Sequence, residues 1–245
     1  MTLIVAHRGA SAHAPENTLA AYELAVQQKA DAVELDVHLT ADGQLAVIHD
    51  DSLDRTTSGS GAVASLTMDQ IRSFDAGARF GDGRFAGQGL QVPTLPEVLD
   101  WLPEDIGLAV EVKARAAVPA TVEALRASRV GRAGEVTVIS FDEASINEAH
   151  ELDPSLVTGL LLVPSDNPER GMTYAVEHHH LGVLPWDGDL GLDPTYLLAQ
   201  AASLGRRIGC YVVDEPERMQ QLAALRLWGF VTNAPDVAAA ALGRA

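Results

Sequence analysis

The sequence is poor in cysteine and in aromatic residues, and it contains no long apolar run. Of its 245 residues, one is a cysteine, Cys210, and 5% are aromatic. A lone cysteine cannot form an intramolecular disulfide, so nothing in the sequence requires an oxidising compartment. We expect Cys210 to fill space in the core.

The sequence also lacks the features of a membrane or secreted protein. No stretch reaches the roughly 18 consecutive apolar residues typical of a membrane-spanning helix. Met1 to Ala6 contains no basic residue, and His7 and Arg8 interrupt the first apolar run, unlike a secretory signal peptide. We therefore expect a cytoplasmic protein with no stable membrane association.

Positive charge is scarce. Lys29 and Lys113 are the only lysines, and the formal net charge is −17. Phosphate backbones and anionic bilayers attract basic patches, so a nucleic-acid partner is not expected, and the acidic surface favours solubility. We expect a small-molecule substrate as the partner; the sequence leaves the oligomeric state open and is compatible with a homo-oligomer.

Apolar residues make up 47% of the chain and follow an alternation of short runs with longer amphipathic segments, which is typical of parallel strands joined by helices. The expected strands are Leu3–Ala6, Ala32–Val37, Leu45–Ile48, Leu108–Val112, Val136–Ser140, Val157–Val163, Gly182–Pro185, Ile208–Val213 and Phe230–Thr232. The expected helices are Thr18–Lys29, Leu95–Leu102, Pro119–Arg129, Glu143–Leu152, Pro168–His178, Pro194–Leu204, Pro216–Leu227 and Asp236–Leu242.

This order predicts a (β/α)8 TIM barrel. Asp42-Gly43 is a strong hairpin signal, so Leu45–Ile48 should fold back antiparallel and leave eight βα units. A doubly wound open sheet is the alternative, but no glycine-rich dinucleotide motif follows the first strand. We expect one catalytic domain, 1–245, in which the polar segment 52–92 is a small insertion after the second strand over the barrel mouth, with a helical pattern around Met68–Phe74.

Three carboxylates lie on otherwise apolar strands. In "AVELDVHLT", Glu34 and Asp36 share one face, and in "LAVEVKA", Glu111 and Lys113 do the same. Buried carboxylates are costly unless a cation compensates them. Glu34, Asp36 and Glu111 therefore predict an oxygen-ligand site for a divalent cation, Mg²⁺ or Ca²⁺ rather than zinc.

Two histidines and two cations accompany these carboxylates at strand ends. His7 ends the first strand and His49 ends the folded-back strand, and histidine suits general acid–base catalysis near neutral pH. Arg8 and Lys113 can neutralise phosphate oxygens. All these groups lie at strand ends, where barrel active sites form. Two acid–base histidines beside two cations that can neutralise phosphate oxygens predict a phosphodiester substrate.

The remaining histidines have simpler interpretations. His13 and His38 are expected to have no direct chemical role. The tract His178–His180 resembles a metal site, but we interpret it as cations at a helix C-terminus.

The sequence resembles the glycerophosphodiester phosphodiesterase family. The resemblance lies in "AHRGASAHAPENT", "VELDVHLTADGQLAVIHDDSLDRTT", "PTLPEVL", "VEVK" and "VISFD", in family order from residue 5 to about 142. Farther along, "YVVD" at Tyr211–Asp214 stands where the family often has "WTVN", and "TNAP" at Thr232–Pro235 replaces "TD.P". These departures concern the pocket wall that would contact the glycerol or the alcohol.

The resemblance implies a TIM barrel with a small insertion, and metal-dependent hydrolysis to sn-glycerol 3-phosphate and an alcohol, within lipid and glycerol metabolism. His7 and His49 resemble the general base and acid, in an order that stays open, and Glu34, Asp36 and Glu111 resemble the metal ligands. Arg8 and Lys113 resemble the phosphate-binding cations. In the opening motif, Asn17 is expected to cap the first helix. The alternatives are a lysophospholipase D or phospholipase D-like enzyme, for which this chain offers little apolar surface, and a catalytically silent barrel, which would have lost a histidine or carboxylate.

Overall fold

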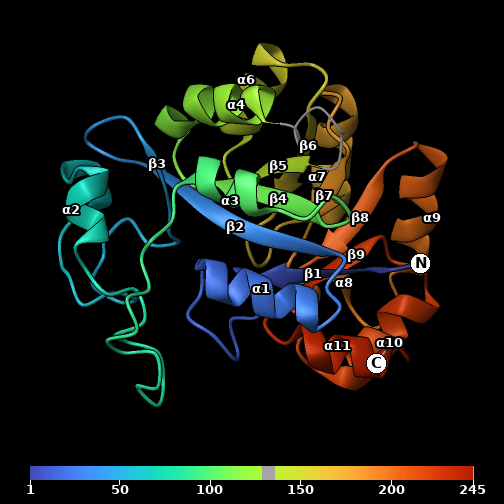
Figure 1. The fold of residues 1–245 in the computed structure, drawn as a ribbon. Helices are drawn as coiled ribbons and strands as arrows, with labels where there is room; N and C mark the ends of the chain where they lie inside the picture. Colours follow the sequence, from blue (N-terminus) through green and yellow to red (C-terminus); the bar gives the residue numbers. More distant parts are fainter. Residues whose placement is uncertain (129–135, 245) are drawn as a thin grey trace.

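Parallel strands alternating with helices form a closed barrel (Figure 1). The computed structural model describes residues 1–128 and 136–244. The strands are β1 (Leu3–His7), β2 (Ala32–Leu39), β3 (Leu45–Val47), β4 (Gly107–Val112), β5 (Val136–Ser140), β6 (Val157–Leu161), β7 (Gly182–Leu184), β8 (Arg207–Cys210) and β9 (Gly229–Thr232). The α-helices in the described residues are α1 (Leu19–Gln27), α2 (Met68–Arg72), α3 (Leu95–Trp101), α4 (Val118–Ala127), α6 (Glu143–Leu152), α7 (Pro168–Glu177), α8 (Asp187–Leu190), α9 (Thr195–Ser203), α10 (Pro216–Ala224) and α11 (Pro235–Ala241).

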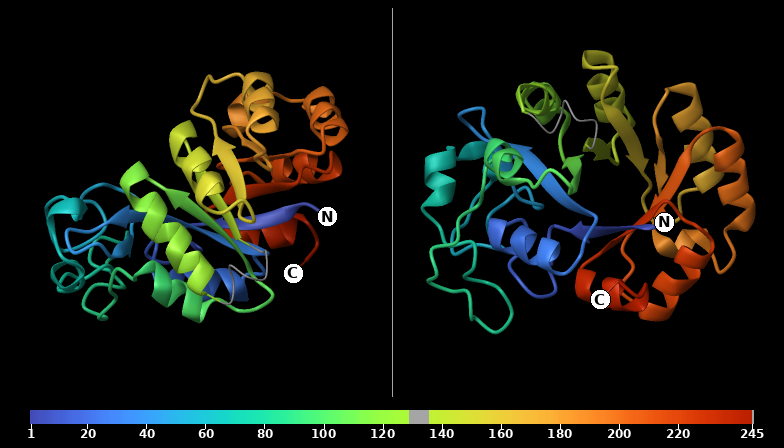
Figure 2. Two further views of the ribbon diagram at one scale, coloured as in Figure 1. Left: turned by 90° about the horizontal axis from the view of Figure 1, so that it is seen from above. Right: turned by 45° about the vertical axis from the view of Figure 1, so that its right-hand side comes forward.

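The sheet closes because β1 pairs in parallel with both β2 and β9. The remaining barrel strands follow in the order β2, β4, β5, β6, β7, β8 and β9, and the helices surround them (Figure 2). β3 lies outside this circuit and pairs antiparallel with β2, as the Asp42-Gly43 turn predicted. The predicted (β/α)8 barrel is confirmed.

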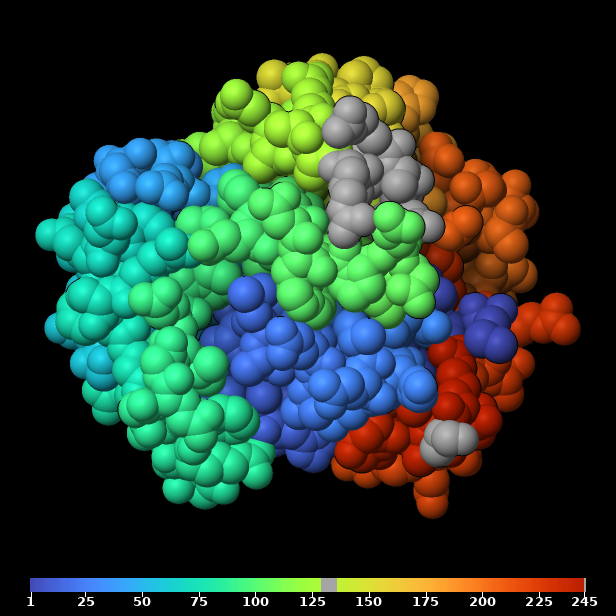
Figure 3. Space-filling view, in the orientation of Figure 1, coloured from blue at the N-terminus to red at the C-terminus, as the bar shows by residue number. Residues whose placement is uncertain are grey.

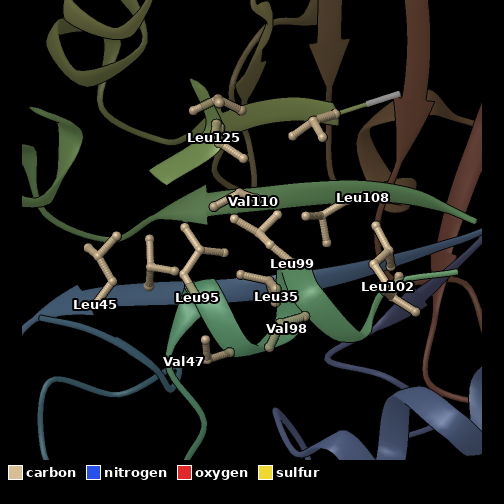
Figure 4. Close-up of a cluster of buried hydrophobic side chains, with 14 of the residues drawn as sticks. Leu35, Leu45, Val47, Leu95, Val98, Leu99, Leu102, Leu108, Val110 and Leu125 are labelled. Atoms are coloured by element: carbon tan, nitrogen blue, oxygen red, sulfur yellow. The ribbon is translucent and has the colours of Figure 1, made fainter. Parts of the chain in front are cut away.

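Helix α3 shows how the sequence builds the layer outside the barrel. A capping box joins Thr94 and Glu97 at its start, and its apolar residues recur at helical spacing. They pack against side chains of β2 and β4 in one buried cluster (Figure 4), whose members include Leu95, Val98, Leu99, Leu102, Leu35, Leu108 and Val110. This packing fixes the two strands that carry the acidic residues of the sequence motifs.

The structure corrects two of the expected strand ends and adds a helix. The strand expected to reach Val213 ends at Cys210, because Tyr211 pairs with the loop after β7: its amide donates to Pro185 O at 3.2 Å. The strand expected to reach Val163 ends at Leu161, because the Val163 amide donates to the Asp166 carboxylate. The short helix α8 was not expected. Arg129, the last residue of the expected helix Pro119–Arg129, lies outside the described residues.

Segment 52–92 contains the expected short helix, α2, and a 3-10 turn at Val63–Ser65. It packs its own small apolar cluster, which includes Leu53, Met68 and Ile71, against β3. The space-filling view shows it as a lobe beside the blue N-terminal part of the chain (Figure 3). Arg55 joins it to that part through an ion pair with Glu16.

The burial of the single cysteine and the lengths of the helices can be compared with the expectations from the sequence. Cys210 is fully buried, as expected of core filler. None of the helices among the described residues combines the length and apolar character that a bilayer-spanning segment requires.

Candidate active site

The chain leaves β1 in a turn that places His7 and Arg8 at the barrel mouth. Arg8 has a φ of 57° and Gly9 a φ of 84°. The Arg8 amide donates to Glu34 Oε2 at 2.9 Å, which helps to hold a backbone conformation that non-glycine residues rarely adopt. A Cβ on Gly9 would lie 2.6 Å from Ala21, so only glycine allows this turn to pack against α1.

Asn17 has a different role from the expected one. The N-cap of α1 is Thr18, whose side chain accepts from the Ala21 amide. The Asn17 side chain instead donates to Asp36 Oδ2 at 2.8 Å and accepts from the Tyr22 hydroxyl at 2.9 Å. The motif "PENT" therefore provides a buried hydrogen bond that orients Asp36, and the expected cap lies one residue later.

Glu34, Asp36 and Glu111 converge as expected. Asp36 on β2 is in register with Glu111 on β4, and each of the three residues offers an oxygen within 4.8 Å of the others. All three are buried. Burial and the neighbouring Asp36 raise the pKa of Glu111 to about 7, and burial raises that of Glu34 well above its ordinary value. Three carboxylates packed this closely call for a positive partner.

Two cations meet part of that need. The Arg8 Nε lies 3.2 Å from Asp36 Oδ2, and the Lys113 Nζ lies 2.6 Å from Glu111 Oε1 and 3.4 Å from Asp36 Oδ1. Burial opposes ionisation of Asp36, but these two cations hold its pKa below the ordinary value. Asp36 Oδ1 is nevertheless buried, and no hydrogen bond joins it to any of the described residues. An unsatisfied carboxylate oxygen among three acidic side chains fits a hard divalent cation.

His7 is held by residues near the C-terminus. Its Nδ1 lies 2.7 Å from Asn233 Oδ1, which also accepts from the Ser11 hydroxyl. The orientation of the Asn233 amide is set because its Nδ2 donates to Asp214 Oδ2 at 2.6 Å. Nδ1 of His7 must therefore be the donor, which assigns the lone pair to Nε2. Burial, followed by the charge of Arg8, lowers the pKa of His7 and keeps the ring neutral near pH 7.

His49 is oriented in the same way by its neighbour. Its Nδ1 donates to Asp50 Oδ1 at 2.7 Å, which assigns the lone pair to Nε2 in the neutral ring. Burial lowers the pKa of His49, although Asp36 and Asp50 oppose that shift. Arg55 donates to Asp50 and to Glu16, which also pairs with Arg8.

Sequence reasoning missed Asn233, Asp214 and Arg55 as parts of this arrangement. The Asn233 and Asp214 positions fall in "TNAP" and "YVVD"; the contact of Asn233 with His7 spans 226 residues of sequence, and Asp214 acts through Asn233. Arg55 lies within the "DDSLDRTT" part of the resemblance, which was the available signal for it.

The other histidines lie away from this arrangement or support it indirectly. His38 donates from Nε2 to the His49 carbonyl oxygen at 3.0 Å, and His13 pairs with Asp236. His180 is fully buried and hydrogen-bonded to Thr158. Burial, followed by neighbouring histidines, lowers the pKa of His180 to about 4, so the interpretation of this residue as a cation at a helix end is wrong.

A cavity of about 210 Å³, the mouth cavity, connects these groups. Its charged half consists of His7, Arg8, Glu34, His49 and Glu111. Its apolar half consists of Ile139, Phe141, Leu161, Tyr211, Val212 and Val231.

A larger cavity, of about 430 Å³, opens at the opposite end of the barrel. The described residues that line it include no histidine and none of the three clustered carboxylates. Ile139 and Val231 line both cavities and so form part of the layer between them. Chemistry rather than size identifies the mouth cavity as the candidate active site.

The model of the glycerophosphoryl diester phosphodiesterase family matches residues 7–237. The chain belongs to this family. A glycerophosphodiester phosphodiesterase of Caldanaerobacter subterraneus is 32% identical over 244 residues, which are 96% of this chain and 95% of that protein. One from Bacillus subtilis is 35% identical over 255 residues, covering 96% of this chain and 84% of that protein.

Solved structures of similar proteins support the same family assignment. The crystal structure of a glycerophosphodiester phosphodiesterase from Agrobacterium tumefaciens matches with a TM-score of 0.84 and 32% identity, over 98% of this chain and 100% of that chain. A phosphodiesterase from Oleispira antarctica, solved in complex with the product sn-glycerol-3-phosphate, matches with a TM-score of 0.86 and 26% identity, over 99% and 97% of the two chains. The chain is a phosphodiesterase of this family, and the resemblance noted in the sequence is confirmed.

Proposed function

We propose that the chain hydrolyses glycerophosphodiesters to sn-glycerol 3-phosphate and an alcohol, and that a divalent cation, Mg²⁺ or Ca²⁺, assists the reaction. The observation that carries the proposal is the convergence of three buried carboxylates, two histidines and two cations at and beside one cavity. The product in the Oleispira antarctica complex supports the same chemistry.

Glu34, Asp36 and Glu111 are the proposed metal ligands. Their oxygens lie within reach of one ion, and within the part of the chain that the structure describes Asp36 Oδ1 has no hydrogen-bond partner. A divalent cation bound there would supply Lewis-acid stabilisation of phosphate charge and a template for the substrate. Oxygen ligands favour Mg²⁺ or Ca²⁺ over softer ions.

Arg8 and Lys113 are the proposed phosphate-binding residues. Their side chains are 16% and 15% exposed; Arg8 lines the cavity, and Lys113 lies beside Glu111, which also lines it. Both already lie beside the carboxylates, and both can stabilise negative charge that grows on the oxygens around phosphorus.

His7 and His49 are the proposed general acid–base pair. One histidine takes the proton of the nucleophile, which is either water or the glycerol 2-hydroxyl, as its oxygen bonds to phosphorus. The other histidine, protonated, gives its proton to the alcohol oxygen as the phosphorus–oxygen bond breaks. Attack by the 2-hydroxyl forms a cyclic phosphate, which water then opens. Asn233 and Asp50 hold the two rings with Nε2 as the atom that exchanges protons.

We also propose a cytoplasmic location and a single catalytic domain. The absence of a membrane-spanning helix among the described residues is compatible with the cytoplasm. Segment 52–92 is proposed as part of a single catalytic domain that borders the mouth, since Arg55 contacts both Asp50 and Glu16 there.

A lysophospholipase D is the second candidate, favoured by one observation. Exposed apolar side chains lie close to the apolar half: Val163 is two residues after Leu161, and Trp186 forms a backbone bridge with Tyr211. A catalytically silent barrel is not favoured, because none of the expected histidines and carboxylates is lost: His7, His49, Glu34 and Glu111 line the cavity, and Asp36 clusters with Glu34 and Glu111.

The test is release of glycerol 3-phosphate from glycerophosphocholine by chelator-treated protein to which Mg²⁺, Ca²⁺, Mn²⁺ or Zn²⁺ is returned. Metal-dependent release is the expected result and identifies the ion. Folded protein that releases nothing with any ion, but cleaves lysophosphatidylcholine, would replace the proposal with the second candidate.

A further inference from the structure

The apolar half of the mouth cavity contains an aromatic pair. Phe141, directly after β5, and Tyr211, directly after β8, meet edge to face with ring centroids 5.7 Å apart and planes at 86°. Both rings line the cavity, and Phe141 keeps 38% of its surface exposed. The Tyr211 hydroxyl donates to Leu162 O at 2.5 Å, so its polar group is already satisfied. The rings therefore offer the cavity an electron-rich aromatic surface.

Two carboxylates lie beside this pair. Asp166 Oδ2 accepts from the Val163 amide at 3.2 Å, and Asp189 Oδ2, from helix α8, accepts from the Ser165 amide at 2.8 Å, which holds both carboxylates against the loop that follows Leu162. Burial comes first, but the charges of Glu111, Asp189 and Asp166 also raise the pKa of the Tyr211 hydroxyl. Both aspartates thus act on the ring electrostatically.

These two charges are not neutralised by the chain. Within residues 1–128 and 136–244, no lysine or arginine forms an ion pair with Asp166 or Asp189. Asp187, in contrast, is paired with Arg218 at 2.8 Å. The aromatic pair of the apolar half therefore lies near two carboxylates, outside the cavity lining, that no lysine or arginine of the described residues neutralises.

We infer that the apolar half binds the leaving alcohol and selects substrates in which this alcohol carries an ammonium group, such as choline or ethanolamine esters. The inference rests on the proposed function, in which the charged half holds the phosphate. With the phosphate there, the alcohol across the scissile bond faces Phe141 and Tyr211. Aromatic faces and nearby carboxylates attract a cation together, through the ring quadrupole and through Coulomb interaction.

Charge decides between this occupant and a fatty acyl chain. An acyl chain would gain from the apolar contacts but nothing from Asp166 and Asp189, which it would help to desolvate. A quaternary ammonium group gains from both because its methyl groups contact the rings while its charge faces the carboxylates.

The test compares glycerophosphocholine with its 3,3-dimethylbutyl ester, in which a carbon replaces the charged nitrogen and the shape is kept. We expect wild-type kcat/KM to favour the choline ester by about 5- to 30-fold, the range of a desolvated cation–aromatic contact. Phe141→Leu and Asp189→Asn should each reduce this ratio several-fold. Tyr211→Phe, which keeps the ring, should reduce it less than Tyr211→Leu.

Asp100→Asn, on the exposed surface of α3, is the matched charge control and should leave the ratio unchanged. Equal rates for the two esters, or a ratio insensitive to Phe141→Leu, would overturn the inference and leave the proposed function intact. Faster cleavage of lysophosphatidylcholine than of glycerophosphocholine would assign the apolar half to an acyl chain and also overturn it. No cleavage of any ester by folded, metal-supplied protein would instead refute the proposed function.

Discussion

The charged and apolar halves of the mouth cavity lie at the same end of one barrel, but different interactions hold their side chains in place. The charged half is oriented by a dense polar network: His7 on Asn233, His49 on Asp50, and Arg8 on Glu16 and Asp36. The apolar half is held by packing, in which Ile139 and Leu161 form a small cluster with Leu184.

This difference separates reaction chemistry from substrate choice. Proton transfer and phosphate binding need atoms placed within hydrogen-bond distance, which polar networks provide. Contact with an alcohol group needs only a complementary surface, which apolar residues provide with fewer constraints on each side chain. Substitutions in the charged half should therefore lower turnover, and those in the apolar half should change selectivity or stability.

The largest effect is expected from the two histidines. His7→Ala or His49→Ala removes a proton-transfer group and should lower kcat by about 10²-fold or more, without unfolding the protein. Steady-state kinetics with glycerophosphocholine, together with circular dichroism, measures both. His13→Ala is the matched control, since the exposed His13 side chain pairs with the exposed Asp236, away from the mouth cavity. A folded double variant that keeps wild-type turnover would remove both histidines from the proposed mechanism.

Glu111→Gln should act next most strongly, through the metal. The loss of one charged ligand should weaken metal affinity by about 10-fold or more, as even changes beyond the ligand shell do. Turnover should recover in part at high metal concentration. Calorimetric metal titration tests the first effect, and a variant with unchanged affinity would place Glu111 outside the ligand set.

Glu111→Gln should also change how the stability of the metal-free protein depends on pH. The pKa of Glu111 is about 7 in the folded chain, above its ordinary value of 4.5, so folding favours the protonated form. Stability of metal-free wild type should therefore fall as pH rises from about 4.5 through 7. Thermal melts across this range should show a flatter dependence in Glu111→Gln, whereas Glu23→Gln, on the exposed surface of α1, should follow wild type.

The sequence was most informative where the charged half is built. Glu34, Asp36 and Glu111 were identifiable because carboxylates are conspicuous on strands whose other residues are apolar. The barrel was predictable because its βα units follow a local period. The apolar half offered no such contrast: Phe141 and Leu161 at strand ends resemble ordinary core residues, and their role depends on which strands close around them.

The missed residues share a physical cause. Asn233, held by Asp214, reaches His7 only because β1 and β9 are neighbours in the closed barrel, a contact that no local pattern encodes. Asn17 was expected as a cap because asparagine caps helices well, but its buried bond to Asp36 depends on the neighbouring strand. Local propensity gave the helix and its approximate start, and tertiary contact decided what the side chain does.

Asp214→Asn should have a smaller effect than loss of a histidine, because Asp214 acts through Asn233. The Asp214 carboxylate accepts from the Asn233 backbone N–H at 2.8 Å and from the Asn233 side-chain Nδ2 at 2.6 Å. Without this charge the Asn233 amide is free to rotate, and His7 loses its preferred tautomer. We expect kcat to fall about 10-fold, less than the roughly 10²- to 10⁴-fold that a general acid–base group itself contributes. The pH–rate profile should also shift, while KM stays near wild type. A change in melting temperature with an unaltered profile would assign Asp214 to stability alone.

Leu184→Ala should have the least effect on catalysis, although it lies directly behind the apolar half. Leu184 packs against Ile139 and Leu161 but does not line the mouth cavity. One side of it already faces the larger cavity at the other end of the barrel, so truncation creates little new empty space. We expect the free energy of unfolding to fall by about 2 kcal/mol, the lower end for a buried Leu→Ala change, with kcat/KM for the choline ester within about threefold of wild type. Denaturant unfolding and steady-state kinetics measure the two quantities. If kcat/KM fell as far as in the histidine variants, packing behind the apolar half would be positioning the reacting groups, and the division between the two halves would not hold.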